Sequence, residues 1–215
     1  MATVHTVTQG EHLSRIARQY GFTDYRTIWD RSENAKLKSA RQNPNVLLPG
    51  DQLFIPDREL REEPRHTDLR HRFQVSRRKL KLAIVLEDMY ERPIAVAPYE
   101  LRIEGDTRSL TTSGDGRFER EIAPDAESAS IVVRDAQTPA SNIAIPVKIG
   151  HLDPVDHVSG QAARLNNLGY FPPVDGTDAE ALRSAVEEFQ CDHGLAVDGK
   201  CGPATQAKLK QVHGC

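Results

Sequence analysis

The segment Leu13-Ser14-Arg15-Ile16-Ala17-Arg18-Gln19-Tyr20-Gly21 has the spacing of one face of an α-helix. Its apolar side chains recur at positions i, i+3, i+4 and i+7, and they are Leu13, Ile16, Ala17 and Tyr20. Gly21 stands where a left-handed residue commonly ends a helix. The segment therefore predicts an amphipathic helix that packs one face against a core.

Shorter signals on both sides of this helix complete a small module. Val4-His5-Thr6-Val7 alternates as a strand does. A second helical face is expected over residues 25–29, and residues 35–40 continue or restart it. Leu53-Phe54-Ile55 then returns as a strand. The predicted order within residues 1–57 is strand, helix, helix, strand.

At these residues the chain resembles the LysM family, whose small βααβ modules bind glycans that contain N-acetylglucosamine. The motifs that carry the resemblance are His5-Thr6-Val7, Gly10, Leu13-Ser14-Arg15-Ile16-Ala17, Tyr20-Gly21, Asn43-Pro44-Asn45, Leu48-Pro49-Gly50-Asp51-Gln52-Leu53 and Ile55-Pro56. Several separated motifs stand in the order typical of the family. The resemblance implies peptidoglycan or a chitin-like glycan as the ligand.

The same resemblance implies a glycan groove between two loops. The loops are Gly10-Glu11-His12-Leu13 and Asn43-Pro44-Asn45-Val46-Leu47. Both flank predicted helix ends, where free backbone N–H groups are available to a sugar. Gly10, Asn43 and Pro44 each have a second interpretation as plain turn residues. His12 has three interpretations: a helix cap, a sugar contact or a protein contact.

The first loop departs from the pattern of wall-binding members, because Glu11-His12 stand where those members usually carry an acidic residue and a threonine. The region between the helices and the last strand is also longer. This variant is similar to LysM proteins encoded beside phage-like contractile injection machines, including type VI secretion spike and baseplate components. It implies a spike, effector or baseplate protein as an alternative partner.

Residues 74–150 alternate with the period of antiparallel strands. Apolar residues recur every second position over 80–86, 99–103, 131–133 and 143–147. Ser113-Gly114-Asp115-Gly116-Arg117-Phe118 is a hairpin signal. The pattern predicts an antiparallel β-sandwich, and it loosely resembles carboxypeptidase-regulatory or Ig-like spacer modules.

Residues 151–215 contain an approximate internal repeat in which Val174-Asp175-Gly176 and Val197-Asp198-Gly199 each precede a helical run. Thr177 and Glu180 have the spacing of a capping box, and Pro203 suits a first helical turn. With an earlier helix that holds Leu165, the pattern predicts a three-helix bundle.

This bundle resembles the three-helix peptidoglycan-binding domain family. The matching motifs are Gln161-Ala162-Ala163-Arg164-Leu165, Leu168-Gly169-Tyr170, the two Val-Asp-Gly turns, Phe189-Gln190, His193-Gly194-Leu195 and Gly202-Pro203-Ala204-Thr205. Tyr170 and Asp198 are candidates for lining a groove for a stem peptide or a glycan. The alternative for Asp198 is a turn residue whose carboxylate bonds its own backbone.

The three cysteines, Cys191, Cys201 and Cys215, all fall in this last module. Cys191 and Cys201 are expected close enough for one disulfide; three free thiols in a reducing cytosol are the alternative.

Composition separates these modules and excludes several classes of function. The run between residues 58 and 73 is too charged to bury an apolar core and is interpreted as a linker. Twenty-eight Lys and Arg against thirty-one Asp and Glu give a formal net charge of −3 over 215 residues, which argues against nucleic acid as a partner. No apolar run approaches a membrane span, and the N-terminal residues lack the features of a signal peptide, so cytoplasmic synthesis is expected.

A search for catalytic chemistry finds no constellation that places a nucleophile or metal beside a base. No His-Glu-x-x-His pattern occurs, and no metal or cofactor is expected. The sequence therefore predicts a multidomain α+β protein that binds peptidoglycan without transforming it. The alternative is an adaptor that holds a component of an injection machine without binding glycan. Delivery by such a machine would bring the protein to the periplasm or outside the cell.

Overall fold

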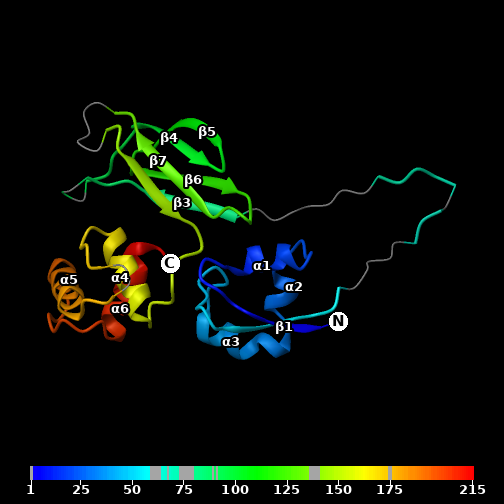
Figure 1. Cartoon of the computed structure of the whole chain (residues 1–215). Helices are drawn as coiled ribbons and strands as arrows, with labels where there is room; N and C mark the ends of the chain where they lie inside the picture. The colour runs from blue at the N-terminus through cyan, green and yellow to red at the C-terminus, as the bar shows by residue number, and fades with distance from the viewer. Residues whose placement is uncertain are drawn as a thin grey trace.

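The structure, a computed structural model, describes residues 2–58, 64–66, 68–72, 80–88, 90, 92–135, 141–173 and 176–215. It has the predicted α+β architecture, with an N-terminal β/α module, central antiparallel sheets and three C-terminal helices (Figure 1). Parts of the predicted linker and the first Val-Asp pair of the internal repeat, Val174-Asp175, lie outside the described residues. The described residues 64–66 and 68–72 of the linker are all exposed.

The N-terminal module pairs its first and last strands. Strand β1 (Thr3–Thr6) runs antiparallel to β2 (Gln52–Ile55). Helix α1 (Leu13–Gln19) follows the first strand and buries Leu13, Ile16 and Ala17, as its periodicity predicts. The expected second helical region is divided into α2 (Arg26–Trp29), the 3₁₀ turn η1 (Ser32–Asn34) and α3 (Ala35–Arg41).

A buried asparagine fixes that division. The Asn34 side chain donates to the carbonyls of Ile28 and Phe54 at 2.8 and 2.9 Å, and it accepts from the backbone N–H of Phe54 at 2.8 Å. These bonds tie the turn after α2 to strand β2. Trp29 is buried in the core of this module, with Ile28 and Leu53 among its neighbours.

The central module consists of two antiparallel sheets. One pairs β3 (Leu80–Val85) with β6 (Arg117–Ile122), and the other has the order β5-β4-β7-β8. The four strands of the second sheet are β4 (Pro98–Ile103), β5 (Asp106–Thr111), β7 (Ser128–Val133) and β8 (Ala144–Lys148). The Tyr99 ring on β4 stacks on the Phe118 ring on β6 with centroids 4.5 Å apart, so aromatic packing joins the two sheets.

The C-terminal module contains α4 (Val158–Asn167), α5 (Ala179–Asp192) and α6 (Pro203–His213). Its core cluster includes Val155, Leu165, Phe189 and Leu209. Pro203 occupies the first turn of α6 as predicted. The predicted capping box is wrong: Asp178, one residue later than Thr177, is the N-cap, and its carboxylate accepts from the N–H groups of Glu180 and Ala181. A charged carboxylate binds these helix-start amides more strongly than a hydroxyl does.

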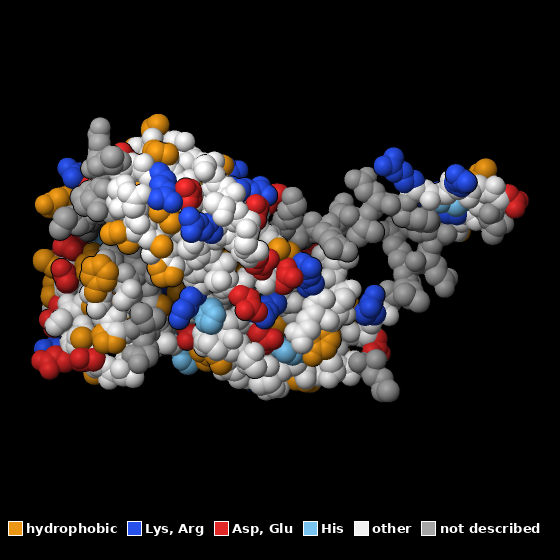
Figure 2. Space-filling view, turned by 45° about the horizontal axis from the view of Figure 1, so that its top comes forward, with side chains coloured by type: hydrophobic (Ala, Val, Ile, Leu, Met, Phe, Trp, Pro, Cys, Tyr) orange, Lys and Arg blue, Asp and Glu red, His pale blue; other side chains and the backbone are white. Residues whose placement is uncertain are grey.

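The chain leaves the sandwich and passes between the N-terminal module and the three helices before α4 begins (Figure 1). Basic and acidic side chains alternate over the face shown in Figure 2, without a large area of one sign. Within the described residues, no helix is long and apolar enough to cross a membrane.

Candidate functional site

The structure brings together the two loops that the sequence predicts as a glycan groove. The N–H of Leu13 donates to the carbonyl of Pro44 at 3.1 Å, so the start of α1 is bonded directly to the second loop. His12 occupies the N-cap position of α1, but its side chain makes no capping hydrogen bond. Of the three interpretations of the His12 side chain, a helix-capping role is therefore excluded.

None of the nine predicted loop residues is exposed. Gly10, His12, Leu13, Val46 and Leu47 are buried, and Glu11, Asn43, Pro44 and Asn45 are half-buried. Leu13 and Leu47 belong to the core of the N-terminal module, so their side chains serve packing.

Glu11 is held inside the first loop by its own neighbours. Its carboxylate accepts from the N–H of Thr8 at 2.8 Å and lies 2.9 Å from His5 Nε2. Burial by itself raises the pKa of Glu11, but the hydrogen bonds from Thr8 and His5 outweigh it and hold that pKa below its ordinary value. Glu11 is therefore an ionised residue that organises the first loop, and the departure from the LysM pattern lies at His12.

Three polar atoms at the two loops are buried without a hydrogen-bond partner among the described residues. They are His12 Nδ1, His12 Nε2 and Asn45 Oδ1. Burial, with the positive charge of Arg15 as a second cause, lowers the pKa of His12 to about 4. The imidazole is therefore neutral at pH 7, with one donor and one acceptor nitrogen. Buried polar groups are normally paired, so these atoms mark the loops as a place where water or a ligand belongs.

Two residues that the sequence analysis did not select position the second loop. Arg41 forms a bidentate pair with Asp51 at 2.8 and 2.9 Å, and Asp51 also accepts from the N–H of Leu48. Asn43 has the turn role, because its side-chain oxygen accepts from the N–H of Asn45 at 2.9 Å. In the sequence, the only signal for the pair of Arg41 with Asp51 was the Pro-Gly-Asp turn at residues 49–51. That turn contains Asp51 but gives no indication of Arg41.

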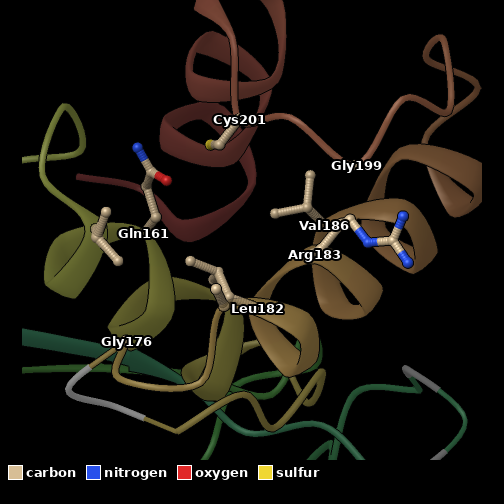
Figure 3. A pocket seen from close by; sticks show the side chains of 9 residues that line it. Gln161, Gly176, Leu182, Arg183, Val186, Gly199 and Cys201 are labelled. Atoms are coloured by element: carbon tan, nitrogen blue, oxygen red, sulfur yellow. The ribbon is translucent and has the colours of Figure 1, made fainter.

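The C-terminal module contains a cavity of about 320 Å³ between α4, α5 and the turn before α6 (Figure 3). The residues that line it are Val158, Gln161, Gly176, Ala179, Leu182, Arg183, Val186, Gly199 and Cys201. Leu182 and Val186 point into its centre, whereas the Arg183 guanidinium extends toward the rim. The arrangement offers a small apolar recess with polar groups at its edge.

Tyr170 and Asp198, the two residues predicted for this module, do not line the cavity. The Tyr170 hydroxyl donates to Asp192 at 3.1 Å, and its ring packs edge-on against Phe189. Asp198 accepts from Gln190 Nε2 and from the N–H of Lys200, both at 2.9 Å. The hydrogen bond from Gln190, followed by that from Lys200, lowers the pKa of Asp198. The interpretation of Asp198 as a turn residue therefore agrees with its contacts.

Gln190, which the sequence analysis treated only as a family motif, organises that turn. Its Nε2 donates to Asp198, to the Lys200 carbonyl and to Thr205, and its Oε1 accepts from the N–H groups of Asp198 and Gly199. A single buried amide thus links α5 to the loop that forms one wall of the cavity.

The three cysteines are free thiols in this structure, and the pairing of Cys191 with Cys201 stays a prediction. Cys215 Sγ lies 3.2 Å from His213 Nδ1. Burial raises the pKa of Cys215 and lowers that of His213 to about 4, so both groups are neutral at pH 7. A thiol beside a neutral imidazole is not the thiolate–imidazolium pair of an activated nucleophile.

Comparison with protein families gives two matches at opposite ends of the chain. The LysM domain family matches residues 5–56, and the peptidoglycan binding domain family matches residues 162–209. No curated protein and no solved structure matches the chain. The chain therefore carries an N-terminal LysM domain and a C-terminal peptidoglycan-binding domain, joined through a module of antiparallel sheets.

Proposed function

We propose that this protein is a non-catalytic peptidoglycan-binding protein with two separate binding sites. The observation that carries the proposal is that one chain matches both the LysM and the peptidoglycan binding domain families. Two weak sites that engage one sacculus raise the overall affinity, because the second binding event becomes intramolecular.

The LysM loops have groups that suit an N-acetylated sugar. Asn45 Oδ1 is an acceptor without a partner among the described residues, and the N–H of an acetamido group would satisfy it. The neutral His12 imidazole adds one donor and one acceptor in the first loop. Recognition of this kind needs hydrogen bonds and no proton transfer.

The C-terminal cavity has a different character, which favours a stem peptide. Its centre is formed by aliphatic side chains such as Leu182 and Val186, and none of the described residues that line it is aromatic. Alanine methyl groups of a peptide fit such a recess. Gln161 and Arg183 supply an amide and a cation for peptide groups and a carboxylate at the edge.

The test is co-sedimentation of the purified full chain with peptidoglycan sacculi. Ala179→Trp fills the cavity and should reduce the bound fraction several-fold. Ser184→Trp is the matched control, because Ser184 is exposed on the same helix and does not line the cavity. Asn45→Ala tests the LysM loops in the same assay. Absence of retention by the parent chain would refute wall binding, and release of muropeptides would refute the non-catalytic assignment.

An adaptor function is the second candidate, and the lack of any exposed residue among the nine predicted LysM loop residues favours it. In that case the LysM domain serves protein contacts, with a spike, effector or baseplate protein of a contractile injection machine as the partner. Recovery of such a component from the producing cell's lysate, without retention on sacculi, would select this candidate. Delivery to the periplasm by such a machine belongs to the same proposal.

A further inference from the structure

The connector, residues 149–156, lies against the first LysM loop. A Cβ atom on Gly150 would stand 2.6 Å from the Gly10 carbonyl oxygen and 3.0 Å from His12 Cδ2. A Cβ atom on Gly10 would in turn stand 2.9 Å from His151 Nε2. The approach of Gly150 to the Gly10 backbone is too close for any side chain, and a side chain on Gly10 would have to displace the His151 ring, so two glycines at distant positions permit the contact. The connector thus covers the loop that the LysM resemblance implies for glycan.

Ion pairs from three LysM arginines hold this arrangement together. Arg18 lies 2.7 Å from Asp125, and Arg15 pairs with Glu127 on the same turn of the sandwich. Arg41 lies 3.7 Å from Asp156 of the connector. The N–H of Ile149 donates to the Glu127 carbonyl at 2.9 Å, which links the connector to that turn.

The far end of the connector is locked to the C-terminal domain. Arg164 donates to the Asp153 carbonyl at 2.8 Å, and Gln161 donates to the Val155 carbonyl at 3.0 Å. A Cβ atom on Gly160 would stand 2.1 Å from the Pro154 carbonyl oxygen, so helix α4 packs directly on this segment. The connector and the three helices therefore form one continuous packed unit.

The contact with the LysM loop is held by weak interactions. Solvent-exposed ion pairs contribute about 0–1 kcal/mol each, whereas a buried polar group without a partner costs about 1–3 kcal/mol. Asp125 and Glu127 are exposed, and both His12 nitrogens and Asn45 Oδ1 are unpaired in the closed arrangement. Opening would uncover the edge of the His12 ring that Gly150 approaches. The ion pairs that favour the closed arrangement are individually weak, and the unpaired His12 nitrogens oppose it, so the contact is one that can open.

We propose that the connector is an intramolecular cover of the LysM groove, and that glycan enters only when the connector and the C-terminal domain move away together. This inference rests on the proposed glycan binding of the LysM domain. It makes the LysM site conditional on the position of the second wall-binding domain. The apparent affinity of the LysM site is then reduced by the fraction of molecules that are closed.

The experiment uses the full chain and two independent readouts. Gly150→Ala places a methyl group against Gly10 and His12 and should displace the connector. Gly105→Ala is the matched control, because Gly105 has the same left-handed backbone, φ +88° against +80°, but nothing within 4 Å of an added Cβ. The first readout is the rate at which diethyl pyrocarbonate modifies His12, with the exposed His157 as internal reference. The second is the affinity for the N-acetylglucosamine hexamer.

A second pair of variants guards against misfolding of Gly150→Ala. Asp125→Lys combined with Glu127→Lys reverses the charges that face Arg15 and Arg18 without touching either LysM loop. Asp106→Lys combined with Glu119→Lys makes the same change in net charge elsewhere on the sandwich, where the partners are Arg108 and Arg117.

In the unmodified chain and in both controls, we expect His12 to react at least about tenfold more slowly than His157. We also expect these proteins to bind the hexamer about tenfold more weakly than the two opened variants, Gly150→Ala and Asp125→Lys with Glu127→Lys, bind it. The inference is overturned if His12 reacts as fast as His157 in the parent. It is also overturned if neither opened variant raises the rate of His12 modification. The same holds if both raise that rate while all forms bind the hexamer with the same measurable affinity. Exposure of His12 in the opened variants with no hexamer binding by any form would instead refute LysM glycan binding and support the cover.

Discussion

At the scale of single residues, His12 is the group whose environment departs most from what its sequence position suggests. Its side chain is 1% exposed, both of its nitrogens lack a partner among the described residues, and the positive charge of Arg15 on α1 acts on it. A neutral imidazole is tolerated there, and an imidazolium is not. The residue therefore opposes the closed fold whenever it is protonated.

Acid should destabilise the protein through His12. The folded pKa of about 4 lies below the ordinary value of 6.5, so the unfolded chain binds more protons between these values, and the free energy of unfolding falls as pH falls from 6.5 to 4. The loss is about 3 kcal/mol at most. In urea titrations at several pH values, His12→Leu should reduce the dependence of the free energy of unfolding on pH. The dependence that remains should include the contribution of His213, whose pKa is also about 4. Equal slopes for the parent and His12→Leu would contradict the assignment.

At the scale of secondary-structure elements, short segments are held by polar side chains. Asn34 secures the turn after α2, Asp178 caps α5, and Gln190 secures the loop between α5 and α6. These loops are too short to form an apolar core, so side-chain hydrogen bonds replace the backbone bonds that regular structure would provide.

Gln190→Leu should destabilise the C-terminal domain strongly. The change leaves the N–H groups of Asp198 and Gly199 without their acceptor and removes the donor to Thr205. We expect a loss of about 2–4 kcal/mol in the free energy of unfolding, measured by urea denaturation. Gln206→Leu is the control, because its amide makes one bond, to the Cys201 carbonyl, and should cost under about 1.5 kcal/mol. Equal losses would show that the network adds nothing beyond a single bond.

At the scale of the whole molecule, Arg164 joins parts of the chain that are distant in sequence. It is 1% exposed and donates to the carbonyls of Asp153, Gly160 and Cys215. Burial lowers its pKa, although a guanidinium stays charged at neutral pH. The side chain thus ties the connector to α4 and to the end of α6.

Removal of this guanidinium should loosen the connector and the helices together. Arg164→Met leaves three carbonyls without their donor and should lower the free energy of unfolding by about 3 kcal/mol or more. Arg183→Met is the control on an exposed position and should change it by less than about 0.5 kcal/mol. Thermal and urea unfolding of the full chain provide the measurement. A loss no larger than that of the control would contradict the structural role of Arg164.

Salt should open the contact between the LysM domain and the rest of the chain. The pairs of Arg15, Arg18 and Arg41 with Glu127, Asp125 and Asp156 are solvent-accessible. Raising the ionic strength from about 0.1 to about 1 M shortens the screening length from about 10 to about 3 Å and weakens them. The rate of His12 modification relative to His157 should therefore rise with salt in the parent. A rate that is independent of salt would contradict an electrostatic contribution to the closed arrangement.

Much of the fold could be predicted from local patterns. The period of 3.6 in residues 13–20 located α1, and the period of two located β3, β4, β7 and β8. Strand β5 (Asp106–Thr111) was not predicted, because five of its six residues are exposed and its sequence lacks apolar alternation. Only its pairing with β4 reveals it as a strand.

The sequence by itself determined the three kinds of module, among them the LysM and peptidoglycan-binding domains, and it identified two loops that the structure brings together, because each depends on spacing within a short stretch of chain. Only the tertiary structure decided that the connector lies against the first LysM loop, that His12 is buried without a partner among the described residues, and that a cavity without Tyr170 or Asp198 lies between the C-terminal helices. The contact of Gly10 with His151 joins residues on two different modules. Local spacing carries no signal for such a contact, since it depends on how the modules pack.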